Sequence, residues 1–178
     1  MDAPEKISGR TALLAAALLV VVALAGLSQL ELSIQDSSNR TWRQVPLEDV
    51  RNGESFTVSE LEKPALVETF AVWCPTCTRQ QEEVRKLHEQ TSVNTVSLNV
   101  DPNEDASKIR SHIQKHGFDW RYAAAPPDLT KKLVENFGRS MIHPPSAPVV
   151  LVCENGSRKL QSGVKPVSKL KQEVQRGC

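Results

Sequence analysis

The chain has 178 residues, and its 22 lysines and arginines nearly balance its 21 aspartates and glutamates. This balance excludes the strongly basic surface on which nucleic-acid binding depends, so no nucleic-acid partner is expected. The length suits one domain of ordinary size once an N-terminal hydrophobic segment is set aside.

Residues 1–10 carry Lys6 and Arg10 and lead into an apolar run at residues 11–27. We predict that this run is a hydrophobic helix, either a single-pass membrane anchor or a signal peptide. Because neither lysine nor arginine follows it before Arg40, the N-terminus is expected in the cytoplasm and the rest of the chain outside it. The protein is thus expected to be membrane-anchored with an extracytoplasmic domain, or secreted if the segment is cleaved.

Residues 28–44 are predicted to be a tether and residues 45–178 a folded domain. In chain order, the pattern predicts a strand at 55–58, a strand at 64–73, a helix at 78–90, a strand at 93–100, a helix at 104–116, a helix at 128–137, a strand at 148–153, a hairpin strand at 157–160 and a helix at 167–174. This order is typical of an α/β fold with a mixed central sheet and helices on both faces.

The strongest signal lies between a predicted buried strand and a predicted helix, where the sequence reads Cys74-Pro75-Thr76-Cys77. In the first turn of a helix the two sulfurs come within reach of each other. The free N–H groups and the dipole of the helix stabilise a thiolate at the first cysteine. A thiolate beside a second thiol performs thiol–disulfide exchange. Pro75 suits the first helical position, where its missing N–H costs nothing.

Zinc binding is the other common use of a CxxC pair. It requires four ligands, usually from a second pair of cysteines or histidines at similar spacing. Cys153 and Cys178 each stand alone in the sequence, so the strand–CxxC–helix context favours redox chemistry. Cys153 is predicted to be a small buried side chain in a core strand, and Cys178 to be either a free thiol or a paired one.

The segment from Phe70 to Cys77, with an apolar strand before it and Pro148 opening a later strand, resembles the thioredoxin superfamily. Leu98–Pro102 before a helix and Gly117–Trp120 after it resemble the insert of larger members of that superfamily. Those members are the redoxin-like, membrane-tethered thiol–disulfide proteins of cytochrome maturation and oxidase assembly.

The resemblance spans residues 45–178 and implies a thioredoxin-like fold and a thiol:disulfide oxidoreductase that acts outside the cytoplasm. The partners that it implies are protein disulfide or dithiol substrates and a membrane redox protein that recharges the site. The membrane itself is expected to be contacted through residues 11–27. The expected redox group is the Cys74–Cys77 pair alone, with no further cofactor.

Three residues are expected to carry the chemistry. At a helix N-terminus the first sulfur is expected to be more exposed and to have the lower pKa, so Cys74 is predicted to be the nucleophile. Cys77 then resolves the mixed disulfide. By the resemblance, Glu68 relays a proton to or from Cys77, with a pKa raised by burial in its strand. The alternative is a strand-end Glu68 that reaches water or a lysine.

Four residues are expected to bind the substrate: Trp73, Pro75, Ala147 and Pro148. Trp73 and Pro75 flank the nucleophile. Pro148 matches the cis-proline of the superfamily, which opens the strand facing the CxxC and presents backbone groups to the substrate. Ala147 stands where relatives often place a larger β-branched residue.

Two alternative functions stay open. In the first, Cys74, Cys77 and His143 are the ligands of a copper site, as in the Sco-type copper chaperones. Those proteins typically separate their cysteines by three residues, and the competing interpretation of His143 is a solvent-facing loop residue. The second is a thiol peroxidase, which needs a threonine three residues before its cysteine; here that position is Ala71, and the threonine is Thr69. His112 and His116, four residues apart, are predicted to be surface residues.

Overall fold

A computed structural model describes residues 40–178, of which Thr41–Cys178 form one compact unit. The predicted cytoplasmic segment, the hydrophobic helix at residues 11–27 and most of the tether lie outside the described residues. Within the described part of the chain, none of the helices has the length and apolar character needed to cross a bilayer.

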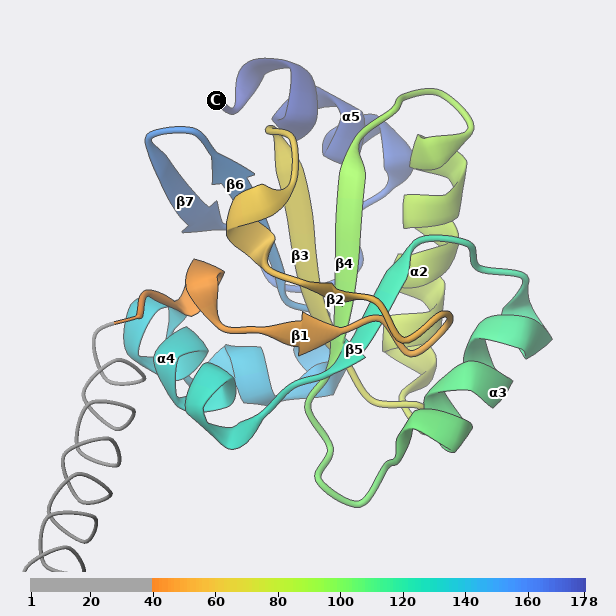
Figure 1. Ribbon diagram of the computed structural model, residues 1–178. Helices are drawn as coiled ribbons and strands as arrows, with labels where there is room; N and C mark the ends of the chain where they lie inside the picture. The colour runs from red at the N-terminus through yellow and green to blue at the C-terminus, as the bar shows by residue number, and fades with distance from the viewer. Residues whose placement is uncertain (1–39) are drawn as a thin grey trace, which may run out of the picture. The chain divides into compact units, whose positions relative to one another are not determined.

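The main sheet has the strand order β5–β4–β3–β6–β7 (Figure 1). Its strands are β3 (Ala65–Phe70), β4 (Asn94–Asn99), β5 (Arg121–Ala124), β6 (Val149–Cys153) and β7 (Gly156–Lys159). β3, β4 and β5 run parallel, whereas β6 and β7 are antiparallel to their neighbours. Every residue of β3 is buried, as expected of a central strand that is covered on both faces. The predicted mixed sheet is therefore confirmed.

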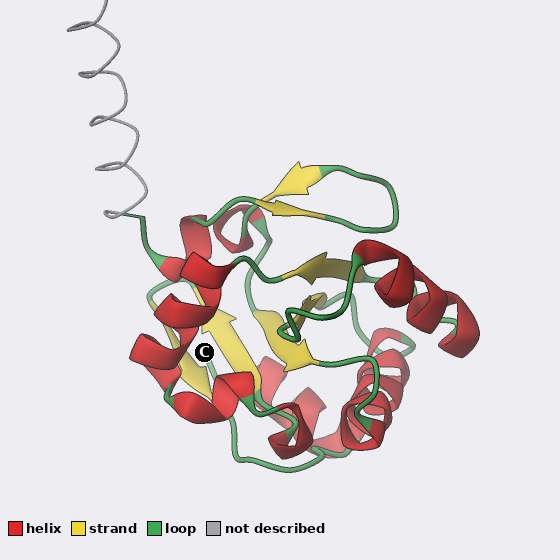
Figure 2. Cartoon of the chain, turned by 90° about the horizontal axis from the view of Figure 1, so that it is seen from below, coloured by secondary structure: helices red, strands yellow, loops and turns green. Residues whose placement is uncertain are grey.

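Helices cover both faces of this sheet (Figures 1 and 2). They are α2 (Pro75–His88), α3 (Ala106–His116), α4 (Pro127–Phe137) and α5 (Val167–Arg176). Side chains of α2, α3 and α5 share one buried core, and side chains of α4 share the other with the segments that precede β3. We call the two sides of the sheet the α2 face and the α4 face.

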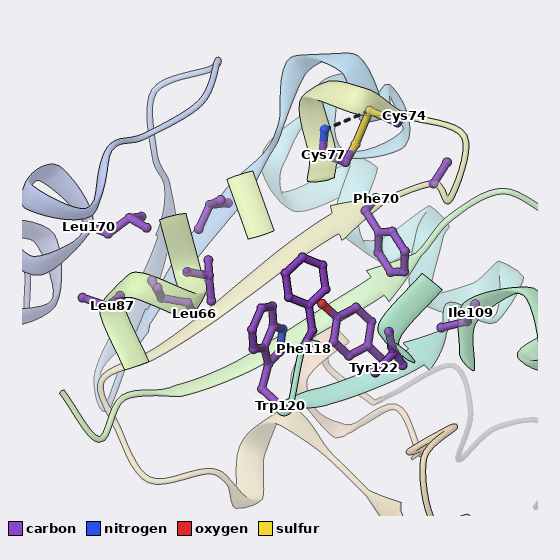
Figure 3. Close-up of a cluster of buried hydrophobic side chains, with 14 of the residues drawn as sticks. Leu66, Phe70, Cys74, Cys77, Leu87, Ile109, Phe118, Trp120, Tyr122 and Leu170 are labelled. Atoms are coloured by element: carbon purple, nitrogen blue, oxygen red, sulfur yellow. Dashed lines mark hydrogen bonds between the residues drawn. A yellow bond between two sulfur atoms is a disulfide. The ribbon is translucent and has the colours of Figure 1, made fainter. Parts of the chain in front are cut away.

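The alternation of side chains along β3 assigns its residues to these two faces. Leu66 and Phe70 pack in the core of the α2 face, together with the cysteines of the CxxC motif (Figure 3). Ala65 and Val67 pack in the core of the α4 face. Glu68 has the same parity as Leu66 and Phe70, so its carboxyl group lies on the side of α2, the helix that carries the cysteines.

The folded unit begins earlier than predicted. Trp42, in the short 3-10 turn η1 (Trp42–Gln44), is buried and meets the ring of Phe137 edge-on at 5.4 Å. An aromatic side chain of this size stabilises the segment by burial, so residues 41–44 belong to the domain rather than to the tether.

The chain before β3 adds a second, smaller sheet. Its strands are β1 (Leu47–Glu48) and β2 (Ser55–Phe56), and the turn η2 (Val58–Glu60) follows them. The strand predicted at 55–58 is therefore two residues long, because Thr57 caps η2 and ends the extended backbone.

A second disulfide corrects the prediction for Cys153. This residue is joined to Cys178, with their Cα atoms 5.5 Å apart, so it is not a free buried thiol. The bond joins the last residue of β6 to Cys178, which follows Gly177 after the end of α5. A Cβ at Gly177 would overlap the Leu151 side chain and the carbonyl oxygen of Glu173, so the backbone is tightly packed there.

Candidate functional site

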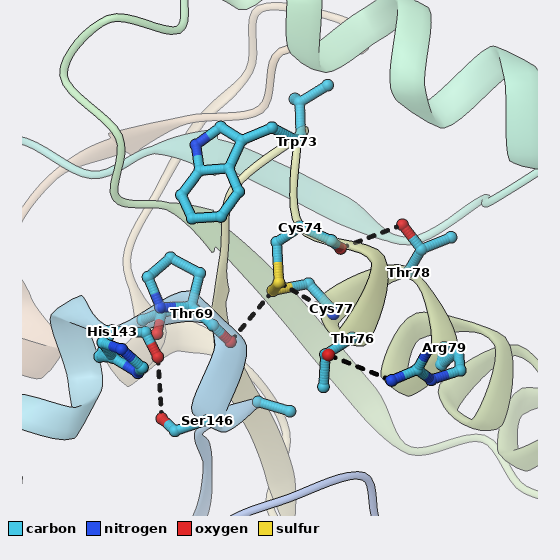
Figure 4. Close-up of a disulfide and its surroundings, with 12 residues drawn as sticks. Thr69, Trp73, Cys74, Thr76, Cys77, Thr78, Arg79, His143 and Ser146 are labelled. Carbon is cyan, nitrogen blue, oxygen red and sulfur yellow. Dashed lines mark hydrogen bonds between the residues drawn. A yellow bond between two sulfur atoms is a disulfide. The ribbon is translucent and has the colours of Figure 1, made fainter.

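The CxxC motif lies where β3 gives way to α2. Cys74 is the N-cap residue of α2, and its Sγ accepts a hydrogen bond from the main-chain N–H of Cys77 at 3.1 Å. Pro75 occupies the first helical turn, as predicted. Cys74 and Cys77 are joined in a disulfide with their Cα atoms 5.3 Å apart (Figure 4). The helix N-terminus therefore directs an N–H donor and the positive end of its dipole at the first sulfur.

The two cysteines do not differ in exposure as predicted. Cys74 is 1% exposed and Cys77 is 2% exposed, because the segment that carries His143 and Ser146 packs over them (Figure 4). Hydrogen-bonding surroundings distinguish them instead. The Cys77 Sγ lies 3.2 Å from the carbonyl oxygen of Pro144, an acceptor for its proton in the dithiol form. Cys74 Sγ faces a donor, which suits a thiolate, whereas Cys77 Sγ faces an acceptor, which suits a thiol.

The expected cis-proline is not found. Among residues 40–178 the cis peptide bond is Lys63–Pro64, and the bond before Pro148 is trans. Ala147 takes a left-handed conformation (φ 44°) that ends the turn η4 (Pro144–Ser146), and its N–H donates to the Pro144 carbonyl at 2.8 Å. This turn sets the direction in which the chain enters β6. The Pro148 carbonyl accepts a hydrogen bond from the N–H of Thr69 in β3 at 3.2 Å.

Ala147 and Pro148 are both buried, and their role in substrate binding stays a prediction. Trp73, by contrast, is 57% exposed beside the disulfide, and its Nε1 donates to Asp101 Oδ2 at 2.6 Å. Asp101 also lines a groove of about 580 Å³, together with Glu104 and the exposed Ile142. Exposed apolar surface is therefore present next to Cys74.

The hydrogen-bond partners of Glu68 are set by the register of three strands. Glu68 in β3 pairs with Ser97 in β4, and Ser97 pairs with Tyr122 in β5, so these side chains form one row on the α2 face. The indole Nε1 of Trp120 donates to Ser97 Oγ at 2.8 Å. Because indole is only a donor, the Ser97 hydroxyl directs its own proton to Glu68 Oε1, 2.5 Å away.

The α2 side of the carboxyl group is occupied by Gln81, one helical turn (about 5.4 Å) beyond Cys77. Gln81 Oε1 accepts a hydrogen bond from His112 Nε2 at 2.7 Å, and the Gln81 side chain lies close to Glu68, although its Nε2 makes no hydrogen bond within the described part of the chain. His112 is buried against Phe70, so the prediction of a surface residue was wrong. Burial lowers the pKa of His112 to about 4, so it stays neutral near pH 7.

Burial raises the pKa of Glu68 to about 7, as expected from the sequence. The hydrogen bond from Ser97, the positive charge of Lys165 and the contact with Gln81 act in the opposite direction and favour the carboxylate. The cost of removing the charge from water is larger than these contributions. Glu68 can therefore take up and release a proton near neutral pH.

Lys165 is a site residue that sequence reasoning missed. It lies in the loop before α5, only 4% exposed, and burial lowers the pKa of its ammonium group to about 8 against the opposing charge of Glu68. Lysine is almost never fully buried, and the loop gave no periodic pattern that assigns its side chain to the core.

The residues of the two alternative functions are less well placed. With the disulfide closed, no three His, Cys, Asp or Glu side chains of residues 40–178 lie together as a metal-binding group, so Cys74, Cys77 and the exposed His143 do not form a copper coordination set in this state. The hydroxyl of Thr69 donates to the Met141 carbonyl at 2.6 Å on the α4 face, whereas Cys74 and Cys77 pack on the α2 face.

The raised pKa of Glu68 predicts a pH-dependent loss of stability. Between pH 4.5 and 7, Glu68 is ionised in the unfolded chain but still largely protonated in the folded one, so the free energy of unfolding falls as the pH rises. Above pH 7 this loss is complete, at about 3 kcal/mol. As the pH rises from 4 to 8, the free energy of unfolding of Glu68→Gln should therefore increase by about 3 kcal/mol relative to that of the wild-type chain, as measured by urea unfolding. The control Glu82→Gln, at an exposed position on α2, should show no such trend. A difference in the free energy of unfolding between Glu68→Gln and the wild-type chain that does not change with pH would contradict the raised pKa of Glu68.

A mixed sheet of this strand order, with a CxxC disulfide at the start of the helix after the central strand, is that of a thioredoxin-like thiol–disulfide oxidoreductase. Comparison with family models identifies the subgroup. The Redoxin model matches residues 34–172, well over half of the sequence, and the chain belongs to the Redoxin family.

Solved structures with the same fold include a secreted Mycobacterium tuberculosis disulfide oxidoreductase homologous to E. coli DsbE (15% identity, TM-score 0.61, covering 75% of this chain and 96% of that one). A SCO1/SenC family lipoprotein from Bacillus anthracis has 19% identity and a TM-score of 0.58, covering 74% and 91%. A thiol:disulfide interchange protein from Chlorobium tepidum has 20% identity and a TM-score of 0.57, covering 74% and 90%. A search of curated proteins found no significant match.

Proposed function

We propose that this protein exchanges disulfides with partner proteins outside the cytoplasm through its CPTC site. The observation that carries the proposal is the Cys74–Cys77 disulfide at the N-terminus of α2, with the buried carboxyl group of Glu68 on the same face of the sheet. This arrangement combines a stabilised thiolate, a second thiol and a proton acceptor in a site that works without a further cofactor.

In the dithiol form, the Cys74 thiolate attacks one sulfur of the substrate disulfide. A Cys74–substrate S–S bond forms, and the other substrate sulfur leaves as a thiolate. Cys77 then loses its proton and attacks Cys74 Sγ, so the Cys74–Cys77 disulfide forms and the second substrate sulfur leaves. Two electrons pass to the substrate. The reverse sequence oxidises a substrate dithiol.

We assign Glu68 as the group that accepts the proton of Cys77. A carboxyl group with a pKa near 7 is ionised in a large fraction of molecules at neutral pH, and it can accept the thiol proton when Cys77 attacks. In the reverse direction the protonated Glu68 returns the proton to Cys77. The exposed indole of Trp73 and the groove beside it offer the partner protein its contact surface.

We further propose that residues 11–27 anchor the domain on the extracytoplasmic side of a membrane, where a membrane redox protein recharges the cysteines. The apolar run, preceded by Lys6 and Arg10, supports the anchor and its orientation. The Cys153–Cys178 disulfide, away from the CxxC motif, supports an oxidising compartment, since disulfides of this kind persist there.

The full chain, purified in detergent, should catalyse the reduction of insulin disulfides by dithiothreitol, and the activity should disappear in Cys74→Ser. Insulin offers accessible protein disulfides and its reduction is followed by turbidity. A variant without the remote disulfide, Cys153→Ser/Cys178→Ser, removes the same kind of bond elsewhere and should retain the activity at temperatures where it is folded.

A reduced, folded chain that leaves insulin unchanged would contradict the proposed function. Binding of one equivalent of Cu(I) by that chain, lost in His143→Ala, would then support the copper-binding alternative. Reduction of hydrogen peroxide at a rate that exceeds insulin reduction would support the peroxidase alternative.

A further inference from the structure

The main chain of Lys165 is bound to the helix that carries both cysteines. Its N–H donates to Gln80 Oε1 at 2.7 Å, and its carbonyl accepts from Gln80 Nε2 at 3.4 Å. Gln80 lies in α2, three residues after Cys77, and is fully buried. The reciprocal pair of hydrogen bonds fixes the loop before α5 against the first half of α2.

The side chain of Lys165 runs inward from this point. Its Nζ donates to the carbonyl oxygen of Ala147. Ala147 follows the turn whose Pro144 carbonyl lies 3.2 Å from Cys77 Sγ, and the Ala147 N–H donates to that same Pro144 carbonyl. The ammonium group therefore holds the segment that packs over the disulfide.

The charge of Lys165 acts on Glu68. The titratable groups that face Glu68 are Lys165, from the loop before α5, and Tyr122, from β5. The other elements packed against the carboxyl group contribute Ser97 and Gln81, which do not titrate. Among the described residues, Lys165 is thus the cation that offsets the burial of the carboxylate.

We propose that Lys165 is a positioning residue for disulfide exchange, whose ammonium group binds the Ala147 carbonyl and stands as a buried cation near the Glu68 carboxyl group. This role rests on the proposed function of the CxxC site. The buried cation keeps a larger fraction of Glu68 ionised and ready to accept the Cys77 proton. Its hydrogen bond to Ala147 keeps the Pro144 carbonyl beside the sulfur of Cys77. One side chain thus affects both the ionisation of Glu68 and the position of the segment that packs over the disulfide.

The test replaces Lys165 by methionine, which has a similar length and no charge; removing one member of a buried charge pair costs stability, and Glu68 limits that cost by holding its proton. In the oxidised full chain, the Glu68 titration midpoint, followed by ¹³C-carboxyl NMR, should rise by about one pH unit, a tenfold increase in proton affinity. The exchange rate at pH 7 should fall several-fold and approach the wild-type rate at high pH, where Glu68 is ionised in both proteins.

Lys169→Met is the matched control, because Lys169 is an exposed cation on α5 that pairs with Glu173 rather than with Glu68. It should leave the Glu68 midpoint and the exchange rate unchanged. Lys165→Arg retains the charge and should keep the midpoint near its wild-type value, which a purely structural role of Lys165 would not require. An unchanged Glu68 midpoint in a folded Lys165→Met variant would overturn the proposal.

A reciprocal measurement is independent of whether Lys165→Met folds. In Glu68→Gln, the Lys165 ammonium group loses its opposite charge, so its titration midpoint, followed by NMR of the lysine side chain, should fall; an unchanged midpoint would overturn the link between the two groups. Both midpoints are measured on oxidised protein without substrate. Failure of insulin reduction by the wild-type chain would therefore refute the proposed function and leave the electrostatic link to be judged on its own result.

Discussion

A Cys77→Ser variant is expected to accumulate as a mixed disulfide between Cys74 and the substrate, and its multiple-turnover rate should fall by at least about a thousandfold. Cys74 keeps its position at the N-terminus of α2 and still attacks the substrate disulfide. The serine hydroxyl that replaces the second thiol does not displace the product, so the covalent intermediate persists. Non-reducing electrophoresis and mass spectrometry of the full chain with insulin would detect the adduct and locate it.

The assignment of the two cysteines is tested by the reciprocal variant. Cys74→Ser should form no comparable adduct, because the Cys77 sulfur faces the Pro144 carbonyl, an acceptor that favours the thiol over the reactive thiolate. Cys153→Ser/Cys178→Ser, which opens a disulfide remote from the site, should release product normally. An adduct through Cys77 in Cys74→Ser, at the rate seen for Cys77→Ser, would show that the nucleophile was assigned wrongly.

The second large effect concerns stability. Opening the Cys153–Cys178 disulfide by Cys153→Ser/Cys178→Ser should lower the free energy of unfolding by about 3–4 kcal/mol. The bond joins residues that are 25 apart in the sequence, and a closed loop of that length restricts the unfolded chain substantially. Urea unfolding of the full chain under oxidising conditions, monitored by tryptophan fluorescence, would measure the loss.

The matched control is Cys74→Ser/Cys77→Ser, which opens a loop between residues only three apart. Its loss of stability should be below about 2 kcal/mol, because closing a short loop restricts the unfolded chain less. A change of less than about 0.5 kcal/mol for the Cys153 and Cys178 double variant, within the range of an ordinary surface substitution, would exclude a stabilising role for the remote disulfide.

Local sequence patterns predicted most of the secondary structure. The strand before the CxxC motif, the helix after it and the helix that ends at Gly117 were all predicted close to their observed positions. β5 was missed, because its four residues are too few to show a pattern of their own. Tyr122 and Ala123 become part of a strand by pairing in parallel with β4, and only the folded sheet provides that partner.

The candidate site was predicted in part. Cys74, Cys77 and Glu68 lie within ten residues of one another, and their spacing relative to one strand and one helix was visible in the sequence. The prediction for Pro148 was wrong in its cis bond, because the resemblance to a superfamily does not determine the turn that this chain makes at Ala147. Lys165 and Gln81 were not recognised as neighbours of Glu68.

The sequence by itself determined the redox pair, the strand and helix that hold it, and the presence of an acidic side chain in a buried strand, because each depends on residues that are close along the chain. Only the tertiary structure decided the pKa of that acid. The register of β3, β4 and β5 brings Ser97 to Glu68, and the packing of the loop before α5 brings Lys165 to it. The CxxC motif is thus encoded locally, whereas the pKa of the buried Glu68 is set by residues that meet only when the sheet and its helices are assembled.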